Sequence, residues 1–346
     1  MRAAVFHGPR DIRLSEVPDP TPKTGEVLVR VQRAGICGSD VKRFLYGSYP
    51  WPPGFIMGHE FCGEIAELGP EVGGWRVGEQ VVVEPTLYCG ACFYCRQGHH
   101  NRCVDFMRRG ITGSGTDGAF AEYVRLPAYQ LHRRPPELST RLAALVEPTA
   151  VSVHGWHLAG LDRPDSVVVV GTGNIGLLAI LVARAKGARQ IIAVGKYPPR
   201  QDLARAYGAQ LVLEPDDARL QDLILERTEG LGATLVLEAA GTPSSLRTAV
   251  AAARKGGKIV VLGVFQEEVA LDYRTILLHE KQIIGSLIYQ RQDFADALRL
   301  LARGEVDTRR HVTGEIPLEA IIPRGFVPLS EKRAEHIKIQ VCLPEE

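Results

Sequence analysis

Residues 165–176 read DSVVVVGTGNIG, an apolar β-branched run followed by a glycine-rich turn that opens a helical pattern. From there to about residue 287, short β-branched segments alternate with helical segments. Strands that alternate with helices form a parallel sheet covered on both faces. Gly171, Gly173 and Gly176 have the spacing of a dinucleotide-binding turn, in which glycines permit close approach of a pyrophosphate. The sequence therefore predicts an α/β Rossmann fold, a doubly wound parallel sheet.

The second strand of this fold, QIIAV, indicates which dinucleotide binds. Such folds place an Asp or Glu roughly 20 residues after the turn, where it binds the adenosine ribose. Here the strand runs into Gly195 and Lys196, with Arg200 shortly after. A glycine leaves room for a 2′-phosphate and two cations can neutralise it, so we predict that NADP(H) is preferred. The alternative is that Lys196 is solvated and NAD(H) is accepted.

The preceding part of the chain has a different character. The first 130 residues favour strands, with EVLVRV alternating at 26–31 and prolines between segments, and 346 residues are enough for two domains.

The formal net charge is +1, and no long basic block occurs. Neither nucleic acid nor a membrane is therefore an expected partner. The first residues lack the apolar core of a signal peptide, which predicts a cytoplasmic location.

Four of the seven cysteines fall in the stretch YCGACFYCRQGHHNRC at 88–103. The spacing C-x2-C-x2-C-x7-C brings four thiolates within reach of one ion, which is typical of a closed structural zinc site. Disulfides and an iron-sulfur cluster are the alternatives, and both fit the rest of the chain less well. We predict a structural zinc bound by Cys89, Cys92, Cys95 and Cys103.

A catalytic metal needs an open coordination position, so three ligands of mixed type are expected elsewhere. The candidates are Cys37 in GICGSD, the pair His59 and Glu60 in MGHEF, and Glu147 in LVEPTA. Each has an ordinary reading when taken alone. A single cysteine is usually a core residue, a His-Glu pair usually lies on the surface, and a Glu-Pro pair usually marks a turn.

Together and in this order, these features resemble the zinc-containing medium-chain alcohol dehydrogenases, in particular their polyol branch of sorbitol, butanediol and threonine dehydrogenases. The resemblance covers nearly the entire chain. It includes the GHE triplet, the four-cysteine lobe, DGAFAEY at 117–123, the Glu-Pro motif and GSLIYQRQDF at 285–294.

The resemblance implies roles for the residues near the metal. Cys37, His59 and Glu147 would bind the catalytic zinc, with Glu60 beside it and Asp40 orienting His59. Ser39 would accept the alcohol proton. Relatives continue this relay with a histidine where this chain has Lys42, and a lysine is a poor acceptor at neutral pH unless it is desolvated, so the outer relay would run through water or Glu60 instead. The implied cofactor-binding residues are Gly171, Gly173, Asn174, Ile175, Gly176, Gly195, Lys196, Arg200, Leu262 and Val264.

The architecture implied by the resemblance is a GroES-like catalytic domain formed by residues 1–150 and 288–346, with the zinc lobe at 88–104 and a Rossmann domain inserted at 151–287. A homotetramer is expected. The implied activity is hydride transfer between NADP(H), or NAD(H), and a secondary alcohol, vicinal diol or polyol. The alternatives are a sugar-phosphate or L-threonine dehydrogenase, and a non-catalytic nucleotide-binding protein of the same fold.

Overall fold

The computed structural model describes residues 1–47 and 51–344. The chain forms two compact units, one from Met1–Glu147 together with Thr308–Glu346 and the other from Pro148–Asp307. We call them the terminal unit and the central unit. The terminal unit thus combines an early and a late segment of the chain, and the late segment starts at Thr308, whereas the resemblance implies a start at residue 288.

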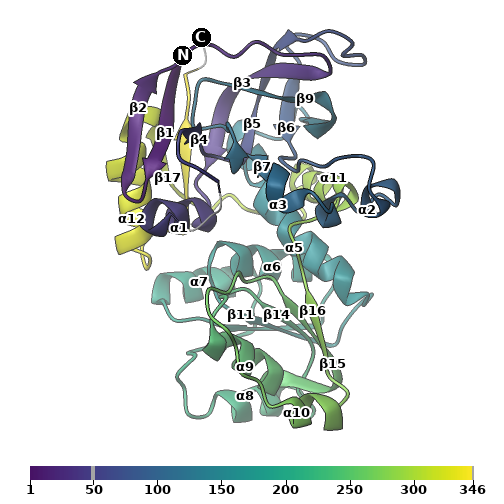
Figure 1. The fold of residues 1–346 in the computed structure, drawn as a ribbon. Helices are drawn as coiled ribbons and strands as arrows, with labels where there is room; N and C mark the ends of the chain where they lie inside the picture. The colour runs from purple at the N-terminus through teal and green to yellow at the C-terminus, as the bar shows by residue number, and fades with distance from the viewer. Residues whose placement is uncertain (48–50, 345–346) are drawn as a thin grey trace. The chain divides into compact units, whose positions relative to one another are not determined.

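The terminal unit is rich in strands (Figure 1). Among its described residues, seven strands form the largest sheet, three form a second sheet and two form a third. The largest sheet has the order β10 (Leu131–Arg133), β6 (Gln80–Val83), β5 (Glu60–Leu68), β3 (Glu26–Gly35), β18 (Lys338–Cys342), β17 (Val312–Pro317), and β9 (Tyr123–Pro127) also pairs with β3. The smaller sheets are β2 (Asp11–Glu16), β1 (Arg2–Gly8) and β4 (Phe55–Ile56), and β7 (Ile111–Thr112) with β8 (Gly115–Thr116).

The helices of the terminal unit are short. They include α1 (Gly38–Tyr46), α2 (Phe93–Arg96), α3 (Phe106–Arg109), α4 (Thr140–Ala143) and α12 (Val327–Glu331). Helix α1 begins after Cys37, whose backbone amide donates to the Asp40 carboxylate, and it ends at Gly47 in the left-handed conformation, with φ of 60°. Satisfied amides at the start and a glycine at the end are what a stable helix of this length requires.

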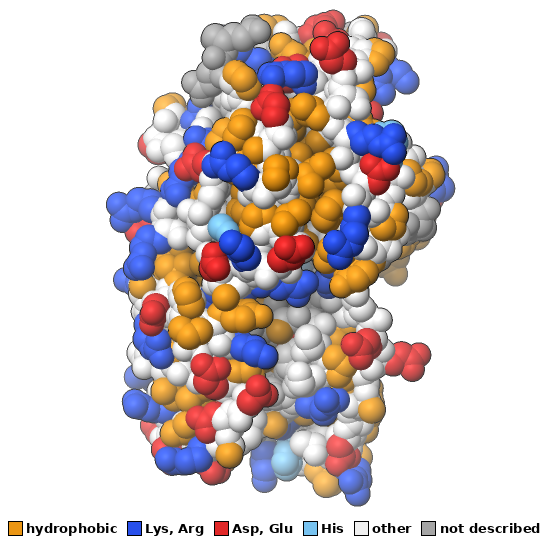
Figure 2. All heavy atoms as spheres, turned by 90° about the vertical axis from the view of Figure 1, so that its left-hand side faces the viewer, with side chains coloured by type: hydrophobic (Ala, Val, Ile, Leu, Met, Phe, Trp, Pro, Cys, Tyr) orange, Lys and Arg blue, Asp and Glu red, His pale blue; other side chains and the backbone are white. Residues whose placement is uncertain are grey.

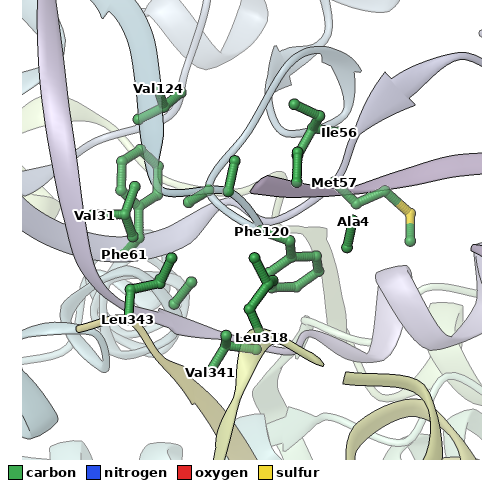
Figure 3. Close-up of a cluster of buried hydrophobic side chains, with 14 of the residues drawn as sticks. Ala4, Val31, Ile56, Met57, Phe61, Phe120, Val124, Leu318, Val341 and Leu343 are labelled. Atoms are coloured by element: carbon green, nitrogen blue, oxygen red, sulfur yellow. The ribbon is translucent and has the colours of Figure 1, made fainter. Parts of the chain in front are cut away.

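The core of the terminal unit lies between its sheets. Figure 3 shows Val31 of β3, Phe61 of β5 and Val341 of β18 among the buried side chains that gather there. Each of the three is at most 1% exposed. Because side chains alternate along a strand, these buried residues fix which neighbours face the other way. This packing holds the first residues of β5 and β18 beside the end of β3.

Every residue of the central unit is described, and its single sheet is parallel, as predicted. The strand order is β13 (Leu211–Leu213), β12 (Gln190–Val194), β11 (Ser166–Val170), β14 (Ala233–Glu238), β15 (Ala253–Val261), β16 (Gln282–Gly285). All residues of β11 and β14 are buried. This order reverses between β11 and β14, which is where open α/β sheets bind their ligands.

Seven helices accompany this sheet within the fully described central unit, and the first starts two residues before it. They are α5 (Val146–Ala159), α6 (Asn174–Ala185), α7 (Pro198–Tyr207), α8 (Leu220–Arg227), α9 (Pro243–Ala252), α10 (Tyr273–Leu278) and α11 (Arg291–Ala302). Residues 288–307 belong to the central unit because helix α11 contacts helix α5. The carboxylate of Asp293 lies 2.7 Å from Nδ1 of His154 and 2.5 Å from Nδ1 of His157, both on α5.

Candidate active site and metal centres

The end of β3 and the start of β5 bring three potential metal ligands together. One ligand atom each of Cys37, His59 and Glu60 lies within 4.8 Å of the other two. The antiparallel pairing of β3 with β5 sets Gly35 opposite Glu60, so that Cys37 follows one strand and His59 precedes the other at the same end. Residues that are distant in the sequence therefore meet because two strands pair in this register.

Asp40 connects two members of this cluster. Its Oδ2 accepts a hydrogen bond from the Cys37 backbone amide at 3.0 Å, and its Oδ1 lies 3.5 Å from Nδ1 of His59. Burial opposes a charge on His59, but the negative charges of Asp40 and Cys37 outweigh it and raise the pKa of the imidazole well above its usual value. The same charges favour a metal cation. With Nδ1 facing Asp40, the Nε2 atom is the one left for a metal.

Lys338 was not predicted from the sequence, and it contacts Glu60 of this cluster. Its ammonium nitrogen is 2.8 Å and 2.6 Å from the two carboxylate oxygens of Glu60 and 3.1 Å from the carbonyl oxygen of Ile36. The Lys338 side chain is 1% exposed and that of Glu60 is 0% exposed. Burial lowers the pKa of Lys338, but the charges of Glu60 and of two further acidic groups outweigh it, so the pKa is raised and the amine is protonated at neutral pH.

One feature of the sequence could have indicated Lys338: it lies inside the segment HIKIQV at 336–341, in which every second residue is apolar. A cation in the middle of a buried strand requires a counter-charge, so this pattern indicates an acidic partner. The sequence does not reveal which one, because the partner is set by how β18 pairs. Gln340 of β18 is paired with Gly35 of β3, and this register carries Lys338 to Glu60.

Glu147 lies in the first turn of α5 and is 6% exposed. Its negative charge contributes to raising the pKa of Lys338, so the carboxylate acts on the same region. Within the described residues, however, the group of ligand atoms that lie within 4.8 Å of one another contains Glu60 and does not contain Glu147. The structure thus brings two predicted ligands together with Glu60 and leaves the third predicted ligand outside that distance.

The two predicted relay residues lie on α1. Ser39 is in the first turn of this helix, two residues after Cys37, and Lys42 follows one turn later. Both side chains are partly exposed. Ser39 therefore lies at the end of α1 that follows Cys37.

The four clustered cysteines form a second potential metal site. The sulfur atoms of Cys89, Cys92, Cys95 and Cys103 all lie within 4.8 Å of one another. All seven cysteines of the chain are described and all are free thiols. Hydrogen bonds from the backbone amides of Val104 and Cys95 lower the pKa of Cys92 to about 6, whereas burial raises the pKa of Cys95 to about 12. Four sulfur donors around one point, without a disulfide, fit a closed zinc site.

His100, which lies in the same stretch as these cysteines, contacts an aromatic ring. The ring of His100 stacks on the ring of Tyr88, with centroids 3.8 Å apart. His100 is thus held by an aromatic neighbour, and the four sulfurs form the ligand set without it.

The glycine-rich turn of the central unit joins β11 to α6. Gly171 has a φ of 106°, a conformation that L side chains rarely adopt. A Cβ atom on Gly176 would lie 1.7 Å from the carbonyl oxygen of Gly171, so only glycine permits this helix to approach the strand so closely. Asn174 and Ile175 form the first turn of α6. The amide groups at this helix start are the kind that bind a pyrophosphate.

Gly195 follows β12, as the sequence indicates, but the reason for a glycine there is different. A Cβ atom on Gly195 would lie 2.1 Å from Oγ1 of Thr172, so a neighbouring side chain already fills the space. Lys196 is exposed. A guanidinium nitrogen of Arg200 is 4.0 Å from where a Cβ on Gly173 would lie, which sets this cation next to the glycine-rich turn.

The two remaining predicted cofactor residues differ from one another. Leu262 is 8% exposed, and a Cβ on Gly155 of α5 would lie 2.5 Å from Cδ2 of Leu262, so this side chain packs against a helix. Val264 is 61% exposed. The Leu262 side chain therefore serves packing, whereas the Val264 side chain is largely exposed.

Comparison with known proteins identifies the family. Residues 23–136 match the family described as "Alcohol dehydrogenase GroES-like domain", and residues 174–303 match "Zinc-binding dehydrogenase". The chain is 34% identical to the sorbitol dehydrogenase of Bacillus subtilis (strain 168), over 92% of this chain and 91% of that protein. This chain belongs to the zinc-containing medium-chain alcohol dehydrogenases. The resemblance to the polyol branch and both halves of the predicted fold class are thereby confirmed.

Further relatives and solved structures agree with this family. The (R,R)-butanediol dehydrogenase of Bacillus subtilis (strain 168) is 33% identical, over 99% of each chain. The crystal structure of a 2R,3R-butanediol dehydrogenase from Bacillus subtilis superposes with a TM-score of 0.90 at 32% identity, over 99% of each chain. This zinc-dependent dehydrogenase is therefore an enzyme, as predicted.

Solved structures of this fold include cofactor complexes. A zinc-binding dehydrogenase from Sinorhizobium meliloti 1021 bound to NADP has a TM-score of 0.89 at 30% identity, covering 99% of each chain. An alcohol dehydrogenase from E. coli CFT073 complexed with NADH has a TM-score of 0.91 at 27% identity, also covering 99% of each chain. A nicotinamide cofactor in this dehydrogenase agrees with its glycine-rich turn, and both forms of that cofactor occur among its structural neighbours.

Figure 2 shows one face of the molecule, on which charges of both signs are mixed. Lysine and arginine side chains are interspersed there with aspartate and glutamate, among hydrophobic side chains. This mixture fits the formal net charge of +1. In the part of the chain that the structure describes, no helix has both the length and the apolar character needed to span a membrane.

Proposed function

We propose that this dehydrogenase transfers hydride between NADP(H) and a secondary alcohol, vicinal diol or polyol, or the corresponding ketone. The observation that carries the proposal is the convergence of Cys37 and His59 at one end of the β3–β5 pair, with Asp40 contacting both and with the carboxylates of Glu60 and Glu147 acting on the same region. Thiolate, imidazole and carboxylate are the ligand types that catalytic zinc prefers. The chain thus combines a suitable donor set with a dinucleotide-binding turn.

The ligands we assign to the catalytic zinc are Cys37, His59 and Glu147. A zinc ion held by them would act as a Lewis acid on the substrate oxygen and lower the pKa of an alcohol. Asp40 supports this assignment because it would orient His59 in the way that metal-bound imidazoles require. Glu147 is supported by its burial and by its effect on the nearby Lys338. Cys89, Cys92, Cys95 and Cys103 would bind a second zinc ion in a purely structural role.

The chain's own part in proton transfer begins at Ser39. Its hydroxyl, in the first turn of α1, would accept the alcohol proton. Lys42, one turn on, is a poor acceptor at neutral pH because an ammonium has no lone pair to offer. We therefore propose that water, and not Lys42, takes the proton from Ser39.

NADP(H) preference is supported by charge near the glycine-rich turn. No carboxylate follows β12, whose next residue is Gly195. Lys196 is exposed, and Arg200 reaches the turn at Gly173. A 2′-phosphate would meet these two cations there, and the Gln201 side-chain amide joins the Gly195 carbonyl oxygen to the one nearby carboxylate, that of Glu214. Because Thr172 fills the space at Gly195, the support comes from these charges and not from the missing side chain.

The names of the relatives support the proposed substrate class. Those reported above are by name sorbitol and butanediol dehydrogenases. We propose a small diol or polyol for this enzyme, in a cytoplasmic homotetramer. A phosphorylated sugar or a hydroxy-amino acid is the alternative class.

The test is a substrate panel of diols, polyols, sugar phosphates and hydroxy-amino acids, assayed with both nicotinamide cofactors. The proposal predicts turnover of a neutral diol or polyol, a higher kcat/KM with NADP(H), and about two zinc ions per chain. Saturating activity on an anionic substrate alone would overturn the substrate class, and a tenfold advantage for NAD(H) would overturn the cofactor preference. About one zinc ion per chain and no turnover would indicate the non-catalytic alternative.

A further inference from the structure

We propose that Glu214 is a specificity-determining residue for the cofactor, whose carboxylate accepts hydrogen bonds from the adenosine ribose of NAD(H) and repels the 2′-phosphate of NADP(H). This inference rests on the proposed binding of the cofactor at the glycine-rich turn. It goes beyond the proposed preference for NADP(H), because it gives a residue of the neighbouring strand the role of the carboxylate that β12 lacks.

The strand register places Glu214 beside the end of β12. Strands β12 and β13 run parallel, and Val194 pairs with Leu213 where both strands end. The next residues are Gly195 after β12 and Glu214 after β13. The backbone amide of Gly195 still donates to the carbonyl oxygen of Leu213, at 2.9 Å. Gly195 and Glu214 therefore both lie at the carboxyl end of the sheet, which is where folds of this kind bind their ligands.

A buried glutamine holds the Glu214 side chain at this place. The side-chain nitrogen of Gln201 donates to the carbonyl oxygen of Gly195 at 2.7 Å, and the same nitrogen donates to Oε1 of Glu214. An amide nitrogen has two protons, so each acceptor receives one. Gln201 lies on α7 and is 8% exposed, whereas Glu214 is exposed. The carboxylate is thus anchored through one oxygen beside the Gly195 backbone and stays accessible to a ligand.

A carboxylate anchored there suits the cofactor without a 2′-phosphate. The ribose of NAD(H) presents hydroxyl groups, and dinucleotide-binding folds usually meet them with an acidic residue at the end of the second strand. In this chain Gly195 and Lys196 occupy that point. Glu214 provides the missing acceptor from β13, because Gln201 joins its carboxylate to the Gly195 carbonyl oxygen.

The same end of the sheet carries the cations that suit NADP(H). The guanidinium carbon of Arg200 lies 5.3 Å from the centre of the Tyr197 ring, and one of its nitrogens is 4.0 Å from where a Cβ atom on Gly173 would lie. Lys196 is exposed. A 2′-phosphate is attracted by these cations and repelled by the Glu214 carboxylate. Glu214 therefore limits the preference for NADP(H) that the two cations create.

The variant Glu214→Gln removes the charge and keeps an acceptor for Gln201. We expect the Kd of NADH to rise and the Kd of NADPH to fall, each by about threefold to tenfold, because a charged hydrogen bond to the ribose is weakened and a repulsion of the phosphate is removed. Isothermal titration calorimetry of the purified, zinc-loaded enzyme without substrate measures both constants independently of turnover. Because Glu214 is exposed, the melting temperature should not change.

Asp216→Asn is the matched control, since it removes the same charge from an exposed residue two positions further along the same loop. Both constants should stay within about twofold of the wild type, because Asp216 lies beyond the residue that Gln201 anchors. Salt provides a second check. Raising the ionic strength from about 0.05 M to about 0.5 M should shrink the effect of Glu214→Gln on NADPH, which is a charge repulsion, more than its effect on NADH, which is a hydrogen bond.

Opposite shifts of the two constants in Glu214→Gln, with Asp216→Asn unchanged, support the inference. Weaker binding of both cofactors would mean that Glu214 maintains the shape of the turn, and equal shifts in the control would mean that only the overall charge matters. Either of these results, or any other pattern, overturns the inference. The wild type tests the proposed function separately: NADH bound tenfold more tightly than NADPH overturns the proposed preference, whereas the shifts in Glu214→Gln still decide the role of Glu214.

Discussion

Gly35 and Glu60 face one another across the β3–β5 pair, and the Glu60 carboxylate occupies the space in which any other residue at position 35 would carry its Cβ atom. A side chain at Gly35 and the observed position of Glu60 therefore exclude one another. The position of Glu60, the most buried carboxylate of the candidate active site, therefore requires a glycine at position 35.

Gly35→Ala should lower the free energy of unfolding by about 1–3 kcal/mol, because the added methyl group overpacks a buried region. Urea unfolding followed by circular dichroism measures this change. Gly73→Ala is the control, since a Cβ atom at Gly73 meets nothing within 4 Å. Equal stability of the two variants would contradict the packing described here.

The pH dependence of stability should reveal Asp293. Burial opposes its charge, but hydrogen bonds from His154 and His157 and from the Gln290 amide outweigh burial and hold the pKa of Asp293 well below its ordinary value. A carboxylate with a depressed pKa stabilises the fold above its unfolded-state pKa of about 4, and this contribution is lost as the pH falls further.

Asp293→Asn removes that contribution. We expect it to lower the free energy of unfolding by about 2 kcal/mol at pH 7, with the difference from the wild type shrinking below about pH 4. Chemical unfolding of both proteins across this range measures it. If the difference in unfolding free energy did not depend on pH, the contact between α5 and α11 would be stabilised by packing and not by the charge of Asp293.

Ser39→Ala should lower kcat by about 100-fold or more, since it removes the group that accepts the alcohol proton. Lys42→Ala should leave kcat within about twofold of the wild type, because the ammonium cannot accept that proton. Steady-state kinetics at saturating cofactor measure both. Losses of similar size in the two variants would place Lys42 in the relay.

Arg200→Ala should lower kcat/KM with NADP(H) by about tenfold while changing that with NAD(H) by less than about twofold, because a charged hydrogen bond to the 2′-phosphate is lost. Arg205→Ala is the matched control on the same helix, where the guanidinium of Arg205 pairs with Asp202 at 2.9 Å. A uniform loss with both cofactors would assign Arg200 to the shared pyrophosphate.

Cys95→Ser should reduce the zinc content from about two ions per chain to about one and lower the melting temperature. Metal analysis and a thermal melt measure the two effects. Cys342→Ser, outside the cluster, should retain both ions. A reducing agent should leave the wild-type melting temperature unchanged, because none of the described cysteines is in a disulfide. A drop in that temperature on reduction would argue against the four-thiol site.

Local patterns were sufficient to predict the parallel sheet of the central unit and the four-cysteine cluster. DSVVVVGTGNIG encodes its strand, turn and helix within twelve residues, and the cysteines approach one another within sixteen. In both cases the residues that must meet are neighbours in the chain. In such cases the spacing of the residues is sufficient to indicate what they bind.

The sequence did not indicate which distant strands and helices would become neighbours. Lys338 meets Glu60 only because β18 pairs with β3, and no local pattern states which strands will be adjacent. The same limit applies to Gly195, whose missing side chain is explained by Thr172 on a different turn. Residues 288–307 join the central unit because Asp293 contacts α5, which the sequence of α11 does not show.

The terminal unit has a consequence for how this enzyme is made. Glu60 and Lys338 are 278 residues apart, and the entire central unit is synthesised between them. Domains fold as units while translation proceeds, so the nucleotide-binding half can mature on the ribosome while one edge of β3 is still bare. Glu60 therefore stays without its buried counter-charge until β18 emerges, and a chain released too early would have a folded nucleotide-binding unit and an incomplete terminal unit.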